Sequence, residues 1–234
     1  MIKSSEQLTS LGIMQEFGST VLMAPRYGVA PNLISNCIFW NADGQLTDTA
    51  TAKTITDVGT SSTTVDGRLC RAYDGSTAFL QVDNAAFNLE SNPFSVGAVI
   101  RPGGAQNSRG IVSLTDGWYE IPALHVASGG LSQVQAMYYS TTSVSASAWV
   151  FVMATFARSG GTITAKIYKN GILAATASDD DWYWHYGPLT IGAYFNQDFG
   201  VAGVFSGHIA DTCVFSRAVT DEEVLSMSEF FGLL

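Results

Sequence analysis

The amino-acid sequence predicts an all-β fold: a two-sheet antiparallel β-sandwich with a short C-terminal helix and an irregular N-terminal arm. The chain has 234 residues, of which 47% are hydrophobic and 13% charged, so it can bury a sizeable core. Glycine is abundant and 12% of the residues are aromatic, a composition that favours β structure. From Asn36 onward, short apolar runs alternate with turn residues, which is typical of a sandwich or a barrel.

Residues 1–35 differ from the rest of the chain. Ser4 can cap a short helix, but the glycines and prolines from Gly12 to Pro31 interrupt any long regular element. We therefore interpret residues 1–35 as an irregular arm for docking or assembly, and residues 36–234 as one sandwich domain.

Two segments, residues 94–100 and 149–156, are too continuously apolar for strands with one face in water. They indicate central strands covered on both sides, or strands with one face under a long loop.

The clearest hairpin spans residues 162–175. Its first strand places Ile163, Ala165 and Ile167 on one face, with polar residues between them. Asn170-Gly171 supplies the positive φ angles that a tight type I′ turn requires.

One helix is predicted near the C-terminus. Thr220 and Glu223 form a capping box, and the acidic first turn lies at the positive end of the helix dipole. Val224, Leu225 and Met227 can then dock the helix on the sandwich.

Six segments resemble, in order, motifs of one large family. Residues 66–75 (DGRLCRAYDG) are similar to an early Gly-x-x-x-x-Ala-aromatic-Asp-Gly signature. Residues 205–224 are similar to a final Gly-x-Ile-Asp-Glu strand and an Asn-Arg-Ala-Leu-Ser-x-Glu-Glu-Ile tail. The segments between them that match are residues 94–102, 149–156, 168–171 and 189–193.

These segments resemble the laminin-G-like, concanavalin A-like jelly-roll family, in its bacterial and phage branch. The chain departs from the family pattern at Val99, where a Trp is usual, and lacks two histidines that follow the position of Trp149. The resemblance implies two antiparallel sheets packed face to face. It implies no particular activity, since this fold carries lectins, hydrolases, lyases and structural modules.

The net charge of −9 argues against nucleic acid and anionic membranes as partners. No apolar stretch approaches the ~20 residues that span a bilayer, and the opening residues contain no apolar segment typical of a signal peptide. Cys37, Cys70 and Cys213 lack metal-ligand spacing and are interpreted as buried thiols. We therefore expect synthesis in a reducing cytoplasm.

The sequence offers no catalytic constellation. Glycan-cleaving enzymes need two carboxylates held in one groove, yet five of the seven glutamates lie in the arm or the terminal helix. His125, His185 and His208 have no nucleophile elbow nearby. The prediction is a protein that is not an enzyme.

No cofactor is expected, although calcium is a weak candidate. The resemblance implies calcium at a sheet rim, but the family's Asp in the final strand falls at Ala210, leaving Asp211. Asp179 and Asp181 offer further carboxylates, but consecutive acids point in different directions and a solvated turn is the simpler interpretation.

The candidate binding residues are aromatic. Trp182, Tyr183, Trp184, His185 and Tyr186 follow one another, and alternate side chains of a strand point to opposite faces, so they cannot all enter one core. They pack an edge strand, contact another protein or stack on sugar rings. Trp118-Tyr119 forms a second, weaker candidate of the same kind.

Three functions follow from these patterns. The leading hypothesis is a structural component of a bacteriophage virion, such as a capsid decoration, head-fibre, collar or tail module. It would assemble with other virion proteins and as a homo-oligomer through its arm. The alternative is a carbohydrate-binding adhesion module for host-surface glycans, and the second alternative is a polysaccharide hydrolase or lyase.

Overall fold

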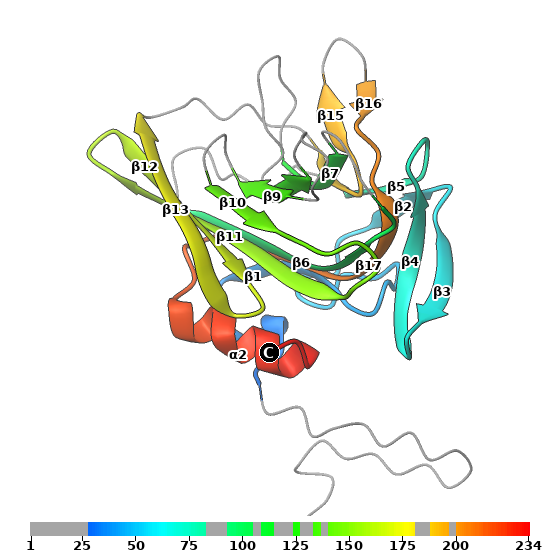
Figure 1. Cartoon of the computed structure of the whole chain (residues 1–234), viewed down its shortest axis with the longest axis horizontal. Coiled ribbons are helices and arrows are strands. Elements are labelled where there is room, and N and C mark those ends of the chain that lie inside the picture. The colour runs from blue at the N-terminus through cyan, green and yellow to red at the C-terminus, as the bar shows by residue number, and fades with distance from the viewer. Residues whose placement is uncertain are drawn as a thin grey trace, which may run out of the picture.

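The computed structural model describes residues 28–82, 93–104, 109–114, 124–126, 133–136, 140–180, 188–196 and 200–234. Within these ranges the chain forms two large antiparallel sheets, one small sheet and an α-helix, α2 (Figure 1). The two large sheets pack face to face, which confirms the predicted β-sandwich with a short C-terminal helix.

The larger sheet has eight strands in the order β13-β12-β11-β6-β17-β4-β3, and β1 pairs with β17 as well. One side of β17 pairs with β6, while β4 and β1 share its other side. The strands are β1 (Cys37–Asn41), β3 (Ser61–Val65), β4 (Arg68–Asp74), β6 (Phe94–Pro102), β11 (Val150–Ser159), β12 (Thr162–Lys169), β13 (Ile172–Asp180) and β17 (Ser206–Phe215).

The second sheet has seven strands in the order β10-β9-β8-β7-β14-β5-β2. The strands are β2 (Ile55–Val58), β5 (Phe79–Val82), β7 (Arg109–Ser113), β8 (Leu124–Val126), β9 (Gln133–Ala136), β10 (Ser140–Ser143) and β14 (Leu189–Ile191). A separate hairpin pairs β15 (Tyr194–Asn196) with β16 (Gly200–Ala202).

The main core lies between the two sheets. Alternate side chains of β6 and β11, such as Val96, Ile100 and Val152, enter it together with Leu80 and Ile191 from the opposite sheet. Because successive residues of a strand point to opposite faces, the other half of β6 and β11 needs separate cover.

A second core supplies that cover on the outer face of the eight-stranded sheet. Val99, Phe151 and Met153 point outward into it and pack with residues of α2 (Asp221–Phe231), among them Met227 and Phe231. The two central strands are thus buried on both faces, as their unbroken apolar sequence predicts.

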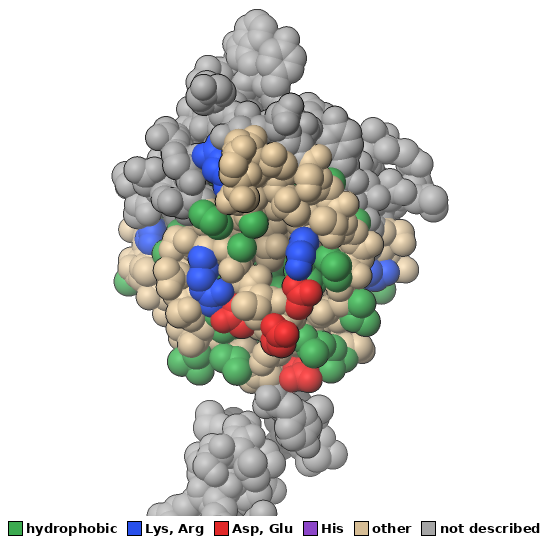
Figure 2. Space-filling view, turned by 90° about the vertical axis from the view of Figure 1, so that its left-hand side faces the viewer, with side chains coloured by type: hydrophobic (Ala, Val, Ile, Leu, Met, Phe, Trp, Pro, Cys, Tyr) green, Lys and Arg blue, Asp and Glu red, His purple; other side chains and the backbone are tan. Residues whose placement is uncertain are grey.

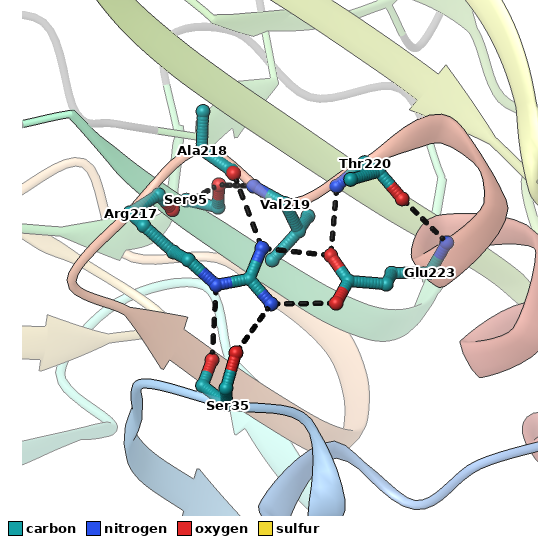
Figure 3. A network of polar contacts seen from close by, with 7 residues as sticks. All are labelled: Ser35, Ser95, Arg217, Ala218, Val219, Thr220 and Glu223. Carbon is teal, nitrogen blue, oxygen red and sulfur yellow. Dashed lines mark hydrogen bonds and ion pairs between the residues drawn. The ribbon is translucent and has the colours of Figure 1, made fainter.

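A polar network fixes the first turn of α2 to the sheet. Thr220 and Glu223 form the predicted capping box, with the Thr220 side chain accepting from Glu223 N. Arg217 donates two hydrogen bonds to the Glu223 carboxylate, at 2.7 and 2.6 Å, and also reaches Ser35 (Figure 3). Ser95 Oγ accepts from Val219 N, so β6 joins the same network.

The last eight residues of the predicted arm, 28–35, pack on their own chain. Gly28 lies directly on α2, where a Cβ atom would come within 2.2 Å of Phe230 N. Val29 N donates to Ser226 Oγ at 3.0 Å, and Ile34 is buried in the second core. Residues 1–27 lie outside the described ranges, so the docking role of the arm stays a prediction.

The predicted hairpin is present as β12 and β13. Asn170 and Gly171 have φ angles of 49° and 78°, which the tight turn requires. Ile163, Ala165 and Ile167 face the main core as predicted. Tyr168 is also fully buried, because α2 covers the opposite face and Asp221 accepts a 2.7 Å hydrogen bond from its hydroxyl.

The three cysteines are free thiols. Cys70 and Cys213 are buried, as expected from the sequence, whereas Cys37 is only half-buried. Burial raises the pKa of the Cys37 thiol to about 12, so this group is protonated at neutral pH.

Candidate functional site

The strands that adjoin the predicted binding residues have their ends at one edge of the seven-stranded sheet. The register pairs Ile55 with Val82, Val82 with Leu189, Thr190 with Ser113, and Val112 with Leu124. The starts of β2, β14 and β8 and the ends of β5 and β7 therefore lie side by side. We call this row of strand ends, from Ile55 to Leu124, the loop edge.

Both aromatic segments are attached to the loop edge. Trp118 and Tyr119 lie between the end of β7 and the start of β8, and Trp182, Tyr183, Trp184, His185 and Tyr186 lie directly before β14. These seven residues are outside the described ranges. The strands that carry them, β7 and β14, are hydrogen-bonded neighbours, so the two attachment points are about 4.8 Å apart across the sheet.

Asp48 organises the connection that enters the loop edge at β2. Its carboxylate is buried and accepts hydrogen bonds from Trp40 N at 3.0 Å, Ala50 N at 2.9 Å, the Thr51 hydroxyl at 2.7 Å and Lys53 N at 3.1 Å. Burial alone would raise the pKa of Asp48, but these hydrogen bonds outweigh burial and hold it below its ordinary value. A charged carboxylate therefore fixes this loop.

Of the three weak calcium candidates, Asp211 has a side chain within the described part of the structure. Asp179 lies on β13 opposite Ile163, its side chain is outside the described part, and Asp181 is outside it altogether. Asp211 lies on β17, on the outer face of the same eight-stranded sheet. Among the described residues, no group of three or more His, Cys, Asp or Glu side chains could hold a metal ion.

The contacts of the Asp211 carboxylate stabilise the fold. Its carboxylate accepts hydrogen bonds from Trp40 Nε1 and Asp43 N, both at 3.3 Å, and lies 3.8 Å from Arg68 Nη1. Burial raises the pKa of Asp211 to about 6, Asp43 adds to the rise, and Arg68 opposes it. These residues do not fit a calcium site, because a cationic Arg68 stands where a metal ion would need oxygen ligands.

Asp48 and Asp211 are the buried carboxylates among the described residues, and each is engaged by the fold. Trp40 donates a hydrogen bond to both carboxylates, through its backbone N–H to Asp48 and through its indole N–H to Asp211.

His208 lies beside Arg101 on the outer face of β17. Burial lowers the pKa of the His208 imidazole, and the positive charge of Arg101 lowers it further. The described residues thus show no acid–base pair of the kind that cleaves glycosidic bonds.

Sequence reasoning missed Asp48 and the ion pair between Arg71 of β4 and Asp57 of β2, which ties the two sheets together. Asp48 had one weak signal, since Asp side chains often bond to backbone N–H groups two or three residues further along the chain. The Arg71–Asp57 pair had none, because it joins strands of different sheets.

Two antiparallel sheets stacked face to face around one core form a sandwich of the jelly-roll kind. A family model described as the concanavalin A-like lectin/glucanases superfamily, Laminin_G_3, matches residues 74–225. The chain belongs to this family, as the sequence resemblance predicts. No curated protein matches the chain.

Several solved structures share the fold. Domain 4 of AbnA, a GH43 extracellular arabinanase from Geobacillus stearothermophilus, in complex with arabinotriose, is 13% identical with a TM-score of 0.57. The match covers 82% of this chain and 98% of the AbnA domain. The botulinum neurotoxin type G receptor binding domain is 14% identical, with a TM-score of 0.57. The match covers 84% of this chain and 52% of the toxin domain. The binding domain of botulinum neurotoxin DC in complex with SialylT is 15% identical with a TM-score of 0.54, covering 85% and 51%. This chain therefore spans about half the length of the toxin domains.

None of the described helices has the length and hydrophobicity needed to span a bilayer.

Proposed function

We propose that this chain is a non-enzymatic carbohydrate-binding module whose ligand site lies at the loop edge. The observation that carries the proposal is the pairing of β14 with β7, with Thr190 opposite Ser113. This register attaches residues 182–186 and the Trp118-Tyr119 segment to neighbouring strand ends. Two aromatic segments that adjoin neighbouring strand ends suit a sugar ligand, since aromatic rings stack on the apolar faces of pyranose rings.

The chemistry of the adjoining residues supports the same ligand class. Asp179, Asp180 and Asp181 directly precede the larger aromatic segment. Carboxylates accept strong hydrogen bonds from sugar hydroxyls. In two of the similar structures the bound partners are arabinotriose and SialylT. Those ligands belong to those proteins, but they support a glycan as the ligand class for this fold.

The proposal is non-enzymatic because the described buried carboxylates are used by the fold. Asp48 accepts backbone N–H groups of its own loop, and Asp211 lies between Trp40 and Arg68. Incubation of the purified chain with a polysaccharide panel should release no new reducing ends and no unsaturated products. Turnover of any polysaccharide would overturn this part of the proposal.

A glycan array with the full chain tests the binding site. We expect binding to a restricted set of glycans, loss of binding in Trp184→Ala and weaker binding in Trp118→Ala. Trp149→Phe is the matched control: Trp149 packs against the second core and donates to Val65 O at 3.3 Å, on the other sheet. It should bind like wild type. A blank array, or full binding by Trp184→Ala and Trp118→Ala alike, would reject the loop edge as a glycan site.

The second candidate is a structural role on a bacteriophage virion, as a capsid decoration, head-fibre, collar or tail module. The observation that favours it is the attachment of residues 28–35 to α2 and to Arg217, which provides a firm base for residues 1–27. Limited proteolysis tests it: in an assembly that uses the arm, cleavage within residues 1–27 should be slow and should release the chain. Rapid cleavage of the arm in a chain that is monomeric at high concentration would reject this candidate.

A further inference from the structure

The segments that adjoin the loop edge are acidic. Residues 83–92 follow β5, residues 115–123 follow β7 after one intervening residue, and residues 181–187 lie before β14. None of these three segments contains Lys or Arg, although the whole chain has 11 such residues. The segments contain Asp83, Glu90, Asp116, Glu120 and Asp181. The sequence therefore concentrates negative charge in the same segments that contain the candidate binding residues.

Chain connectivity keeps two of these acids close to the described strand ends. Asp83 directly follows Val82, the last residue of β5, so their Cα atoms are about 3.8 Å apart. Asp116 comes three residues after Ser113, the last residue of β7, so its Cα lies within about 11 Å of that strand end. β5 and β7 both pair with β14, which puts their ends two strand spacings, or about 10 Å, apart. Two carboxylates therefore adjoin neighbouring parts of the loop edge.

The described cations near these segments are matched by acids or held by the backbone. Lys53, two residues before β2, donates from Nζ to Ile38 O at 2.8 Å. The same connection contains Asp48, whose lowered pKa keeps its carboxylate charged. Arg158 of β11 lies in the same row of the eight-stranded sheet as Asp179 of β13. These cations therefore do not offset the acids of the three segments.

Other parts of the described surface differ, because acids and bases are paired there. Figures 1 and 2 together show the side that carries the β12–β13 hairpin, where basic and acidic side chains adjoin one another. Lys166 Nζ lies 3.0 Å from Asp221 Oδ1, and Arg217 Nη2 lies 2.6 Å from Glu223 Oε1. Such pairing neutralises charge beside α2, whereas the segments at the loop edge have no Lys or Arg of their own for it.

We propose that the loop edge selects glycans by charge: it binds neutral sugars and sugars with a free amino group, and it excludes sugars that carry a carboxylate or a sulfate. This inference rests on the proposed function, because the aromatic rings supply the contact and the acids supply the discrimination. A negative potential attracts an ammonium group and repels an anion. Repulsion of the wrong ligand is a common source of specificity.

A glycan array with matched members tests the selection. Each core sugar is printed in a neutral form, in a sialylated or uronic form and, where available, in a form with a free amine, as with lactose and sialyllactose, or N-acetylchitotriose and chitotriose. At low ionic strength we expect each neutral ligand to bind about tenfold more tightly than its singly acidic counterpart, because several unit charges about 10 Å away each repel a carboxylate and their effects add. The ratio should shrink as salt screens the acids.

The array separates this inference from the proposed function. A blank array rejects the proposed function. Binding of the acidic members as tightly as the neutral ones, or more tightly, keeps the proposed function and overturns the selection by charge.

Two double variants assign the effect to the loop edge. Asp83→Asn combined with Asp116→Asn removes two of its charges and should reduce the preference for neutral over acidic glycans about threefold. Glu222→Gln combined with Glu229→Gln removes two charges from α2, which covers the outer face of the other sheet, and should leave the preference unchanged. A preference that the α2 variant reduces as much as the loop-edge variant would overturn the assignment.

The potential at the loop edge can also be measured without a ligand. Three of the five tryptophans lie in the segments that adjoin this edge, while Trp40 is only 8% exposed. At constant ionic strength, caesium should quench the tryptophan fluorescence more than iodide does, relative to neutral acrylamide, and the loop-edge double variant should narrow the difference. Equal quenching by the two ions, or stronger quenching by iodide, would overturn the inference whatever the array shows.

Discussion

Replacing Asp211 by Asn should remove a pH-dependent loss of stability. The Asp211 side chain is buried, with the residue only 4% exposed, and its pKa is raised from an ordinary value of 3.8 to about 6. An acid whose folded-state pKa is raised holds its proton more tightly in the folded state. The contribution of Asp211 to the free energy of unfolding is therefore most favourable below pH 3.8, and it is lost as the pH rises through about 6.

The size of the effect follows from this difference in pKa. Each unit of difference between the folded-state and unfolded-state pKa values corresponds to about 1.4 kcal/mol. Ionisation of Asp211 therefore lowers the free energy of unfolding by about 3 kcal/mol at pH values above its folded-state pKa. The amide side chain of the variant keeps an oxygen to accept from Trp40 Nε1 and Asp43 N, and it never ionises. The stability of the variant relative to wild type should therefore rise by about 2.5 kcal/mol between about pH 4 and about pH 7.5.

Urea unfolding followed by tryptophan fluorescence measures this difference at both pH values. Other titrating groups are shared by the two proteins, so their contributions cancel in the comparison. Asp48→Asn is the matched control of opposite sign: the pKa of Asp48 is lowered, so wild type should lose its advantage over this variant as the pH falls. A stability difference between Asp211→Asn and wild type that does not change with pH would refute the reasoning.

Two other substitutions test the packing and the helix anchor. Gly192→Ala should cost about 3 kcal/mol in unfolding free energy, because Gly192 has a φ of 80° and a Cβ atom would lie 2.2 Å from the ring of Tyr73. Gly160→Ala, with a φ of 58° and no atom within 4 Å of its Cβ, should cost only about 1 kcal/mol; equal losses would contradict the clash. Glu223→Gln should lower the thermal midpoint at neutral pH, because hydrogen bonds from Arg217 hold the pKa of Glu223 below its ordinary value. That difference should shrink as the pH falls and the wild-type carboxyl becomes protonated, and a difference that grows instead would contradict the role of Arg217.

The elements that the sequence predicts well are those with local causes. The hairpin at Asn170-Gly171 is fixed by the backbone preference of those two residues, and the start of α2 by the pairing of Thr220 with Glu223 three residues later. Residues 94–100 indicate cover on both faces, because an unbroken apolar run has no side for water. What provides that cover does not follow from the run itself, since α2 lies more than a hundred residues further along the chain.

The candidate site shows the same limit. The aromatic segments can be recognised from their composition, but that they adjoin neighbouring strands depends on the register between β7 and β14, which are distant in sequence. Asp211 illustrates the opposite case, where the sequence permits a calcium ligand. The structure places it between Trp40 and Arg68, because β1 and β4 pair with the same edge of β17 on either side of Asp211.

The second core limits where a ligand can bind. The outer face of the eight-stranded sheet is occupied by the second core beneath α2, so that face offers little room for a ligand there. We therefore expect glycan recognition at the loop edge, where the strand ends from Ile55 to Leu124 lie side by side. Trp184→Ala and Trp118→Ala change segments that adjoin this edge, whereas Trp149→Phe changes a residue packed against the second core and should leave binding unchanged.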